Sequence, residues 1–167
     1  VELMAAGLYI HVPFCRRKCP YCNFYSIAAE PELLERYTQA VCRNLRHYAC
    51  AEPVDTVYFG GGTPALAADR LGEIIGAIKE HFVITEGIGV ELHPDNVTPD
   101  VLRTLKTAGV TKISIGIQSF QTKFQSVLGR TSVDISAMKQ ALSEVPFETV
   151  SMDFIFALPN QTFEDLK

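Results

Sequence analysis

The strongest constraint on how this chain folds is the alternation of short apolar runs with amphipathic helical segments. Runs typical of strands occupy residues 8–12, 56–59, 88–92, 112–117 and 149–157. Helical patterns begin near residues 31, 69, 99, 122, 133 and 162. Thr98 and Gly109 are residue types that begin and end a helix. We therefore expect five successive βα units, and so a parallel sheet with right-handed crossovers.

Two architectures contain such units, an open doubly wound sheet and a barrel. A complete eight-stranded barrel takes about 250 residues, and this chain has 167. We therefore predict an α/β fold that is a partial TIM-type (βα) barrel with parallel strands, truncated after about five strands. Residues 1–167 are expected to form one incomplete domain whose remaining barrel lies outside this sequence.

The composition indicates a folded domain and excludes several classes of function. Apolar residues make up 47% of the chain and charged residues 20%, which excludes intrinsic disorder. The net charge of −4 argues against sequence-independent binding of nucleic acid, which requires a basic face. We expect no transmembrane segment and no signal peptide, and hence a cytoplasmic protein.

Five cysteines carry most of the functional information. Cys15, Cys19 and Cys22 follow the first strand within eight residues. In a reducing compartment, thiols clustered in this way indicate metal binding or catalysis rather than disulfides. Cys42 and Cys50 lie in a helical pattern and are expected to be ordinary small hydrophobic residues.

The Cys-x3-Cys-x2-Cys spacing is typical of an iron–sulfur site. Three thiolates can bind three irons of a [4Fe–4S] cluster, whereas electron-transfer clusters normally have four cysteine ligands. The fourth iron is then open to a small chelating molecule. The three basic residues at 16–18 would favour the thiolate forms and offset the negative charge of the cluster.

A structural zinc site is the alternative interpretation of these cysteines. It would need a fourth Cys or His ligand. His11 and Cys42 could supply one, although neither lies at a usual zinc-finger spacing. A non-catalytic zinc- or iron-binding module therefore stays open as a different class of function.

A glycine-rich segment, Gly60-Gly61-Gly62-Thr63-Pro64, follows the second strand. Glycines let backbone groups approach a ligand closely and allow positive φ. No Lys-Ser/Thr pair follows, so the segment is not a phosphate-binding P-loop. It is either a ligand-binding loop or a tight turn between a strand and a helix.

Four polar residues lie on or after the later strands, and a residue at the carboxyl end of a barrel strand is placed to bind a ligand. They are Glu91, Gln118, Arg130 and Asp153. An amide can bond both a hydroxyl and a carbonyl group, and arginine can bind a carboxylate with two hydrogen bonds. The structural alternatives are a solvated acid for Glu91, a surface arginine for Arg130, and for Asp153 an acid paired with a neighbouring helix.

The histidines show no ligand spacing. His11 shares one face of the first strand with Tyr9 and is expected to be a satisfied strand-end histidine. His47, His81 and His93 are expected to face solvent.

The combination of Cys-x3-Cys-x2-Cys with Gly-Gly-Gly-Thr-Pro resembles the radical S-adenosylmethionine superfamily. From Tyr9 to Thr162 the chain is similar to the oxygen-independent coproporphyrinogen III oxidase-like family. The resemblance implies a [4Fe–4S] cluster on Cys15, Cys19 and Cys22. It also implies reductive cleavage of S-adenosylmethionine (SAM) to methionine and a 5′-deoxyadenosyl radical.

The resemblance further implies which residues contact SAM. Gly61, Gly62 and Thr63 would hold its methionyl amino group. Arg130 would bind its carboxylate, and Asp153 the ribose hydroxyls. Tyr9, Glu91 and Gln118 carry over as further contacts.

Within this family, the residue two positions after the third cysteine separates two relatives. The dehydrogenase has a fourth cysteine there, whereas this chain has Phe24, as in the haem chaperone branch. The chaperone assignment implies haem or another tetrapyrrole, a haem-recipient protein and an electron donor of the flavodoxin or ferredoxin type. The coproporphyrinogen dehydrogenase is the runner-up. The family's tetrapyrrole-handling region would lie largely beyond Lys167.

Four positions depart from the family pattern. Asn23 replaces an Asp, Ala157 and Asn160 each replace a Gly, and Ser132 replaces a His.

Overall fold

The computed structural model describes residues 6–48, 53–130 and 132–166, so Cys50 lies outside the described residues. One sheet contains β1 (Gly7–Val12), β4 (Val54–Gly61), β5 (Ile84–Leu92), β6 (Lys112–Gln118) and β7 (Thr149–Phe154), all parallel and in this order. The helices are α1 (Pro31–Tyr48), α2 (Ala68–His81), α3 (Pro99–Ala108), α4 (Thr122–Val127) and α5 (Ile135–Glu144). Short 3-10 turns occupy Pro64–Ala67, Pro94–Asn96 and Phe163–Leu166.

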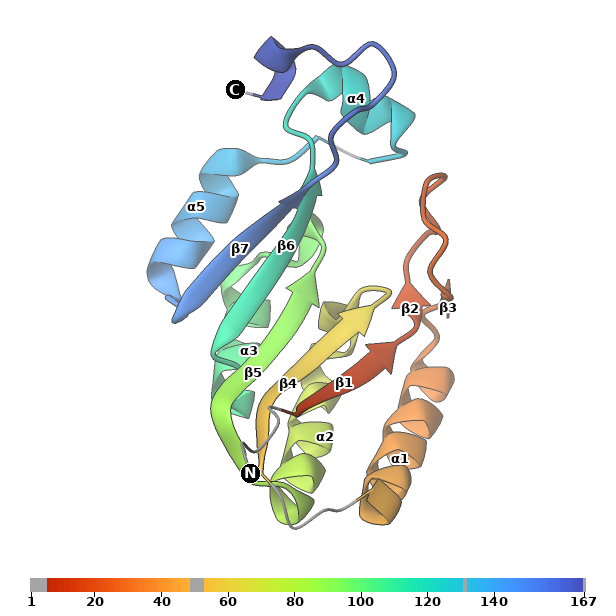
Figure 1. The fold of residues 1–167 in the computed structure, drawn as a ribbon, viewed down its shortest axis with the longest axis vertical. Coiled ribbons are helices and arrows are strands. Elements are labelled where there is room, and N and C mark those ends of the chain that lie inside the picture. The colour runs from red at the N-terminus through yellow and green to blue at the C-terminus, as the bar shows by residue number, and fades with distance from the viewer. Residues whose placement is uncertain (1–5, 49–52, 131, 167) are drawn as a thin grey trace, which may run out of the picture.

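The arrangement of strands and helices distinguishes the two expected architectures. The strand order follows the chain order, and α1 packs on α2, α2 on α3, and α3 on α5 as one row. Figure 1 shows α2 and α3 behind the sheet, with α1 beside β1 and α5 beside β7 at the two ends of the row. A doubly wound sheet reverses its strand order and carries helices on both faces. The partial-barrel prediction is therefore confirmed, and the open doubly wound alternative is wrong.

The hydrophobic core lies between this row of helices and the sheet. Leu71, Ile74 and Ile78 of α2 are fully buried, as their helical spacing predicted, and they belong to the same core cluster as Phe59 and Ile115 of the sheet. Each such side chain contributes about 1.5–3 kcal/mol by burial. This layer fixes the sheet and therefore the edge at which the strands end.

Element boundaries agree with the sequence signals where a specific cap exists. The Thr98 side chain accepts a hydrogen bond from Val101 N (3.4 Å), and Gly109 ends α3 with φ 100°. Without such a signal the prediction was short at one end: β5 begins at Ile84 rather than at residue 88. Its first residues include exposed polar side chains, so the apolar run marks only the buried part of the strand.

A two-stranded ladder that the sequence did not predict closes the cysteine loop. β2 (Phe14–Cys15) pairs with β3 (Ile27–Ala28), and Ile27 N donates to Pro13 O (2.7 Å). Strands of two residues have no periodicity to detect. The ladder turns the segment between them, residues 16–26, into a closed loop at the end of β1.

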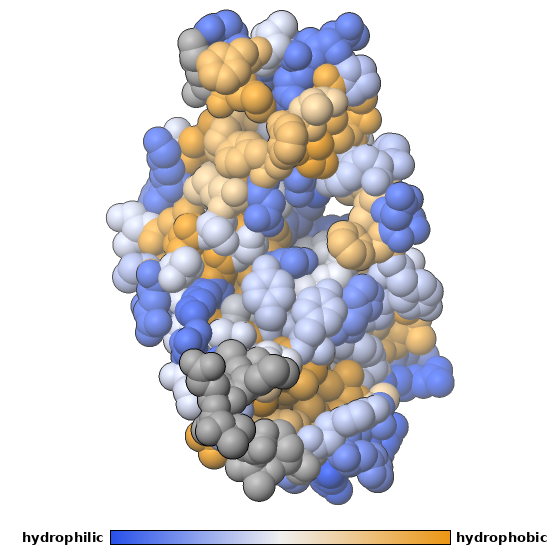
Figure 2. Space-filling view, viewed as in Figure 1, coloured by the Kyte–Doolittle hydropathy of each residue, from blue (hydrophilic) through white to orange (hydrophobic). Residues whose placement is uncertain are grey.

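The sheet face opposite the helices is polar over β1 and β4, and apolar side chains gather towards β7 (Figure 2). Phe120 and Phe154 pack edge to face there, with ring centroids 5.4 Å apart, and Phe156 is exposed beside β7. None of the described helices combines the length and apolar character needed to cross a bilayer.

β7 ends at Phe154 rather than at residue 157, because the backbone leaves the extended conformation. Ala157 has φ 60° and Asn160 has φ 61°, both in the left-handed region. These are the two positions at which the oxygen-independent coproporphyrinogen III oxidase-like family has glycine. The backbone conformation that favours glycine is therefore present, although the glycines are not.

We expect Ala157→Gly to stabilise the protein. The left-handed conformation costs an L-residue about 1–2 kcal/mol, and the greater freedom of glycine in the unfolded chain offsets about 0.5–1 kcal/mol of that gain. Urea denaturation should show a net increase in the free energy of unfolding. Ala40→Gly inside α1 is the control and should lower it. A loss of stability in Ala157→Gly would contradict the prediction.

Candidate cofactor site

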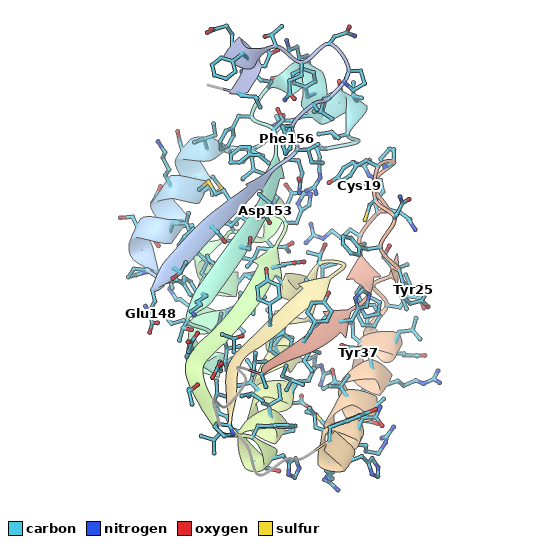
Figure 3. All side chains as sticks on the ribbon, in the orientation of Figure 1. Cys19, Tyr25, Tyr37, Glu148, Asp153 and Phe156 are labelled. Carbon is cyan, nitrogen blue, oxygen red and sulfur yellow. The ribbon has the colours of Figure 1, made fainter. Side chains whose placement is uncertain are left out.

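The predicted site residues meet at the carboxyl edge of the sheet. The cysteine loop follows β1, the glycine loop follows β4, and Glu91, Gln118 and Asp153 come from β5, β6 and β7. Because the strands are parallel, these positions share one edge. Figure 3 shows Cys19 and Asp153 at this edge, although Cys19 follows β1 and Asp153 lies on β7, the two outermost strands of the sheet. Two cavities lie here, one of about 390 Å³ and one of about 200 Å³.

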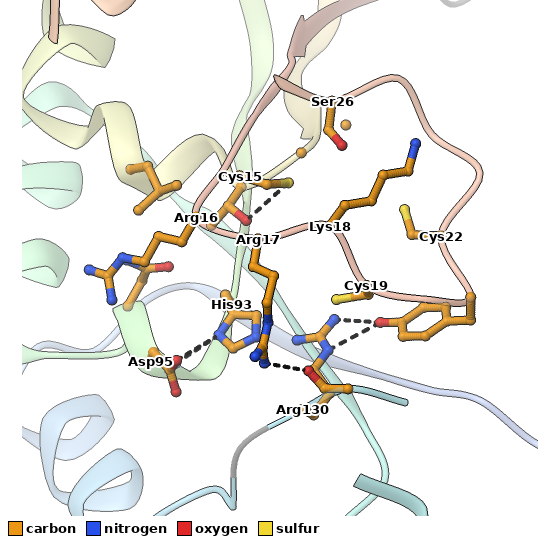
Figure 4. Close-up of a pocket in the computed structure, with 17 residues that line it drawn as sticks. Cys15, Arg16, Arg17, Lys18, Cys19, Cys22, Ser26, His93, Asp95 and Arg130 are labelled. Carbon is orange, nitrogen blue, oxygen red and sulfur yellow. Dashed lines mark hydrogen bonds and ion pairs between the residues drawn. The ribbon is translucent and has the colours of Figure 1, made fainter. Parts of the chain in front are cut away.

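The three predicted thiols line the larger cavity (Figure 4). Cys15, Cys19 and Cys22 are free and partly exposed to it. The basic residues 16–18, the glycine loop and Arg130 complete much of its wall. The structure thus brings together the thiols, the cations and the glycines that the sequence placed in separate motifs.

The thiols are arranged around the cavity rather than about one point. In the parts of the chain that the structure describes, no three His, Cys, Asp or Glu side chains converge as a single metal ion requires. A four-iron cluster binds each thiolate at a different iron, so its ligands must be spread over a cavity wall. Three cysteine sulfurs beside basic residues are soft donors of the kind that iron–sulfur clusters use.

Neither predicted fourth zinc ligand joins the cysteines. The ring of His11 is held by Tyr9 and Tyr25: Nδ1 lies 3.4 Å from the Tyr9 hydroxyl, and Nε2 lies 3.1 Å from the Tyr25 carbonyl oxygen. His11 is therefore the satisfied strand-end histidine that was expected. Cys42 packs against the core from α1, away from the cavity.

The glycine loop lies directly against the start of the cysteine loop. Gly62 N donates to Val12 O (2.8 Å), and Thr63 N donates to Phe14 O (2.7 Å). A Cβ atom at Gly62 would lie 2.6 Å from Phe14 O, so a side chain would separate the two loops. The Thr63 hydroxyl lies 3.9 Å from the Cys15 sulfur. Because Gly62 has no side chain, the backbone of the glycine loop reaches the edge of the larger cavity, which we call the thiol cavity.

The smaller cavity carries the other predicted contacts. Glu91, Gln118, Asp153 and Arg130 line it, together with the glycine loop. The two cavities share several residues: Tyr21, Cys22, Gly61, Gly62, Thr63, His93 and Arg130. They therefore form adjoining halves of one site. Tyr9 lines neither cavity and lies 54% exposed beside the site on β1.

The two carboxylates of the smaller cavity have partners in the sheet. Glu91 Oε2 accepts a hydrogen bond from Gly61 N (3.2 Å), and burial raises the pKa of Glu91 despite that bond. Asp153 Oδ2 accepts one from the Ser114 hydroxyl (2.9 Å). The partner of Asp153 is thus Ser114 on the neighbouring strand β6. The alternative of an acid paired with a neighbouring helix is wrong.

Arg130 is positioned by the short helix α4. Gln125 is buried, and its side chain donates to Ser119 O (2.9 Å) while its carbonyl accepts from Arg130 N (2.7 Å). The guanidinium then donates from Nη1 to Gly116 O (3.2 Å) and from Nε and Nη2 to the Tyr21 hydroxyl (3.2 and 2.6 Å). Arg130 is therefore part of the site and not a free surface arginine.

The prediction that His93 faces solvent is wrong. His93 lines both cavities, and its Nδ1 accepts from Asp95 N (3.2 Å). Burial, followed by the charge of Arg130 and of the guanidiniums at 16 and 17, lowers the pKa of His93 to about 4, although Asp95 acts in the opposite direction. His93 is therefore a neutral imidazole at neutral pH. The sequence signal was its place directly after a strand that ends in the site.

Tyr58 is a polar residue of this region that the sequence analysis missed. It pairs in register with Tyr9, and the two rings stack with centroids 6.4 Å apart. Burial and the charge of Glu91 raise the pKa of Tyr58 to about 12, so its hydroxyl keeps its proton. Its position opposite Tyr9 in neighbouring parallel strands was the signal available.

Comparison with known proteins agrees with this arrangement. The family described as the Radical SAM superfamily matches residues 9–167. The heme chaperone HemW of Lactococcus lactis is 31% identical over 164 residues, which are 95% of this chain and 43% of the relative. The oxygen-independent coproporphyrinogen III oxidase of Bradyrhizobium diazoefficiens is 30% identical over 168 residues, covering 95% of this chain and 37% of that protein. The chain thus spans less than half the length of these relatives.

A solved structure extends the similarity to three dimensions. Coproporphyrinogen III oxidase (HemN) from Escherichia coli, described as a Radical SAM enzyme, superposes with a TM-score of 0.84 at 27% identity. The match covers 97% of this chain and 39% of that protein. It therefore includes the sheet, the row of helices and both loops of the site.

The contact between the two loops predicts different effects for two glycine substitutions. Gly62→Ala should lower the free energy of unfolding by about 1–3 kcal/mol, because its Cβ would meet backbone atoms of Phe14 and Val12. Gly76→Ala in α2 should raise it by about 0.5–1 kcal/mol, since a Cβ there meets no atom within 4 Å. Chemical denaturation measures both. Equal stability of Gly62→Ala and the wild type would refute the contact.

Proposed function

Because this chain belongs to the radical SAM superfamily, we propose that it holds a [4Fe–4S] cluster on Cys15, Cys19 and Cys22 and binds SAM beside it. The observation that carries the proposal is that these three thiols line one cavity that adjoins a second cavity rich in polar groups. We assign the SAM contacts to Tyr9, Gly61, Gly62, Thr63, Glu91, Gln118, Arg130 and Asp153. Residues 1–167 would then be an incomplete radical SAM core domain.

Bound together, the cluster and SAM supply reductive cleavage of a carbon–sulfur bond, chemistry that protein side chains cannot perform. The protein supplies binding and charge. Arg130 offers N–H donors to the SAM carboxylate, and Asp153 offers an acceptor to the ribose hydroxyls. The cations at 16–18 would offset the negative charge of the cluster.

We further propose that the protein acts as a haem chaperone, binding haem and delivering it to a recipient protein. Phe24 supports this, because it stands where the dehydrogenase has a fourth cysteine, and it lines the smaller cavity. The similarity to heme chaperone HemW at about 30% identity also supports it. An electron donor of the flavodoxin or ferredoxin type would reduce the cluster, in a reducing cytoplasm where the thiols stay free.

A second candidate is oxygen-independent coproporphyrinogen III dehydrogenase, which would decarboxylate a porphyrinogen. The close superposition on the Escherichia coli coproporphyrinogen III oxidase favours it. Both candidates use the same cluster and cofactor, so the cysteines do not distinguish them.

The cluster assignment predicts the result of anaerobic reconstitution with iron and sulfide. The wild type should become brown, with about four irons per chain, and should cleave SAM on reduction with dithionite. Cys15→Ala, Cys19→Ala and Cys22→Ala should each lose both properties, whereas Cys42→Ala should keep them, because Cys42 lies on α1 away from the cavity. A colourless wild type that retains one zinc ion would refute the assignment.

The choice between the two candidates predicts opposite outcomes in two assays on the full-length protein. A haem chaperone should bind haem and should not decarboxylate coproporphyrinogen III in the presence of SAM and a reductant. Haem titration by absorbance and product analysis by chromatography measure these properties. Decarboxylation would refute the chaperone proposal and support the dehydrogenase.

A further inference from the structure

The guanidinium of Arg130 is engaged by a residue of the cysteine loop. Its Nε and Nη2 both donate to the hydroxyl of Tyr21, at 3.2 and 2.6 Å, and its Nη1 donates to Gly116 O at 3.2 Å. Figure 4 draws the two bonds to the tyrosine hydroxyl as dashed lines. A guanidinium has five N–H donors. Three of them are therefore used by the protein, and two remain for a ligand.

A second contact holds the same two segments together. Arg17 Nη2 donates to Gly129 O at 2.7 Å. Gly129 has φ 65°, and a Cβ atom there would lie 2.7 Å from Pro20 Cδ, so the loop packs directly on this backbone. We call the contacts of residues 17, 20 and 21 with residues 129 and 130 the loop clamp. It joins two connecting segments that are 109 to 112 residues apart in the chain.

Tyr21 lies between two predicted cluster ligands, Cys19 and Cys22, and lines both cavities together with Arg130. Any cluster that fixes these two cysteines also fixes the tyrosine. Through the loop clamp, it also fixes the direction in which Arg130 presents its two remaining donors. The tyrosine hydroxyl is thus the link between the thiol cavity and the predicted carboxylate-binding group.

We propose that Tyr21 is a positioning residue that orients Arg130 toward the carboxylate of SAM and so couples the cluster loop to cofactor binding. The proposal rests on the proposed function, since it takes Arg130 as the carboxylate-binding group. A bidentate hydrogen bond to a carboxylate depends on the orientation of the planar guanidinium. Removal of the hydroxyl would leave the guanidinium held by the bond from Nη1 to Gly116 O alone, so its plane would be less well fixed.

The test compares two ligands that differ only at the carboxylate. Reconstituted Tyr21→Phe should bind SAM about tenfold more weakly than the wild type and should bind decarboxylated SAM equally well. Arg130→Gln should show the same selective loss, and Tyr21→Phe combined with Arg130→Gln should lose no more than Arg130→Gln alone. Calorimetry under anaerobic conditions gives the affinities. Iron and sulfide contents should equal those of the wild type.

Tyr25→Phe is the matched control, because it removes a tyrosine hydroxyl from the end of the same loop, where the side chain is 68% exposed. It should bind both ligands as the wild type does. Unchanged SAM affinity in Tyr21→Phe would overturn the proposal, and so would an equal loss for both ligands, which indicates a merely structural role. If Arg130→Gln does not discriminate the ligands, the assignment of Arg130 fails. If the wild type does not bind SAM, the proposed function fails.

A second measurement needs no cluster. In metal-free wild type, the Arg130 Nε–H should give a proton NMR signal protected from solvent exchange by the bond to Tyr21. The signal should exchange faster in Tyr21→Phe and should be unchanged in Tyr25→Phe. Equal exchange rates in all three proteins would show that the hydroxyl does not hold the guanidinium, and this would also overturn the proposal.

Discussion

The site depends on the close approach of two backbones at the ends of β1 and β4. Gly62 and Thr63 donate to the carbonyls of Val12 and Phe14, and no side chain could stand at position 62 between them. This contact sets the cysteine loop beside the glycine loop before any ligand is considered. The parallel register then adds the ends of β5, β6 and β7 in order. A packed sheet thus provides the precision that a site built on loops alone would lack.

Charge is divided between the two halves of the site. The cations at residues 16–18 line only the thiol cavity, together with the carboxylate of Asp95, and Arg130 lines both halves, although the chain as a whole carries −4. The adjoining cavity has the carboxylates of Glu91 and Asp153. Such a division suits a ligand that carries a carboxylate at one point and positive charge elsewhere, as SAM does. His93 adds no charge between them, because its pKa is lowered to about 4.

Local signals in the sequence were sufficient for the fold and for the edge of the sheet at which most of the predicted residues lie. Helical spacing identified α2, a threonine cap and a glycine identified α3, and the spacing of three cysteines identified the loop that closes on one cavity. What the sequence did not predict is long-range: the pairing of β2 with β3, the burial of His93, and the bonds of Arg130 to Tyr21. No periodicity connects residues 21 and 130, so only the three-dimensional arrangement reveals their contact.

The loop clamp also has a consequence for biosynthesis. The segment that holds the cysteine loop, at Gly129 and Arg130, leaves the ribosome more than a hundred residues after the cysteines do. At translation rates of about 5–20 residues per second, this delay lasts roughly 5–20 s. During that interval the three thiols are nascent and unclamped. The clamped form of the cysteine loop can therefore exist only after β6 and α4 have been synthesised.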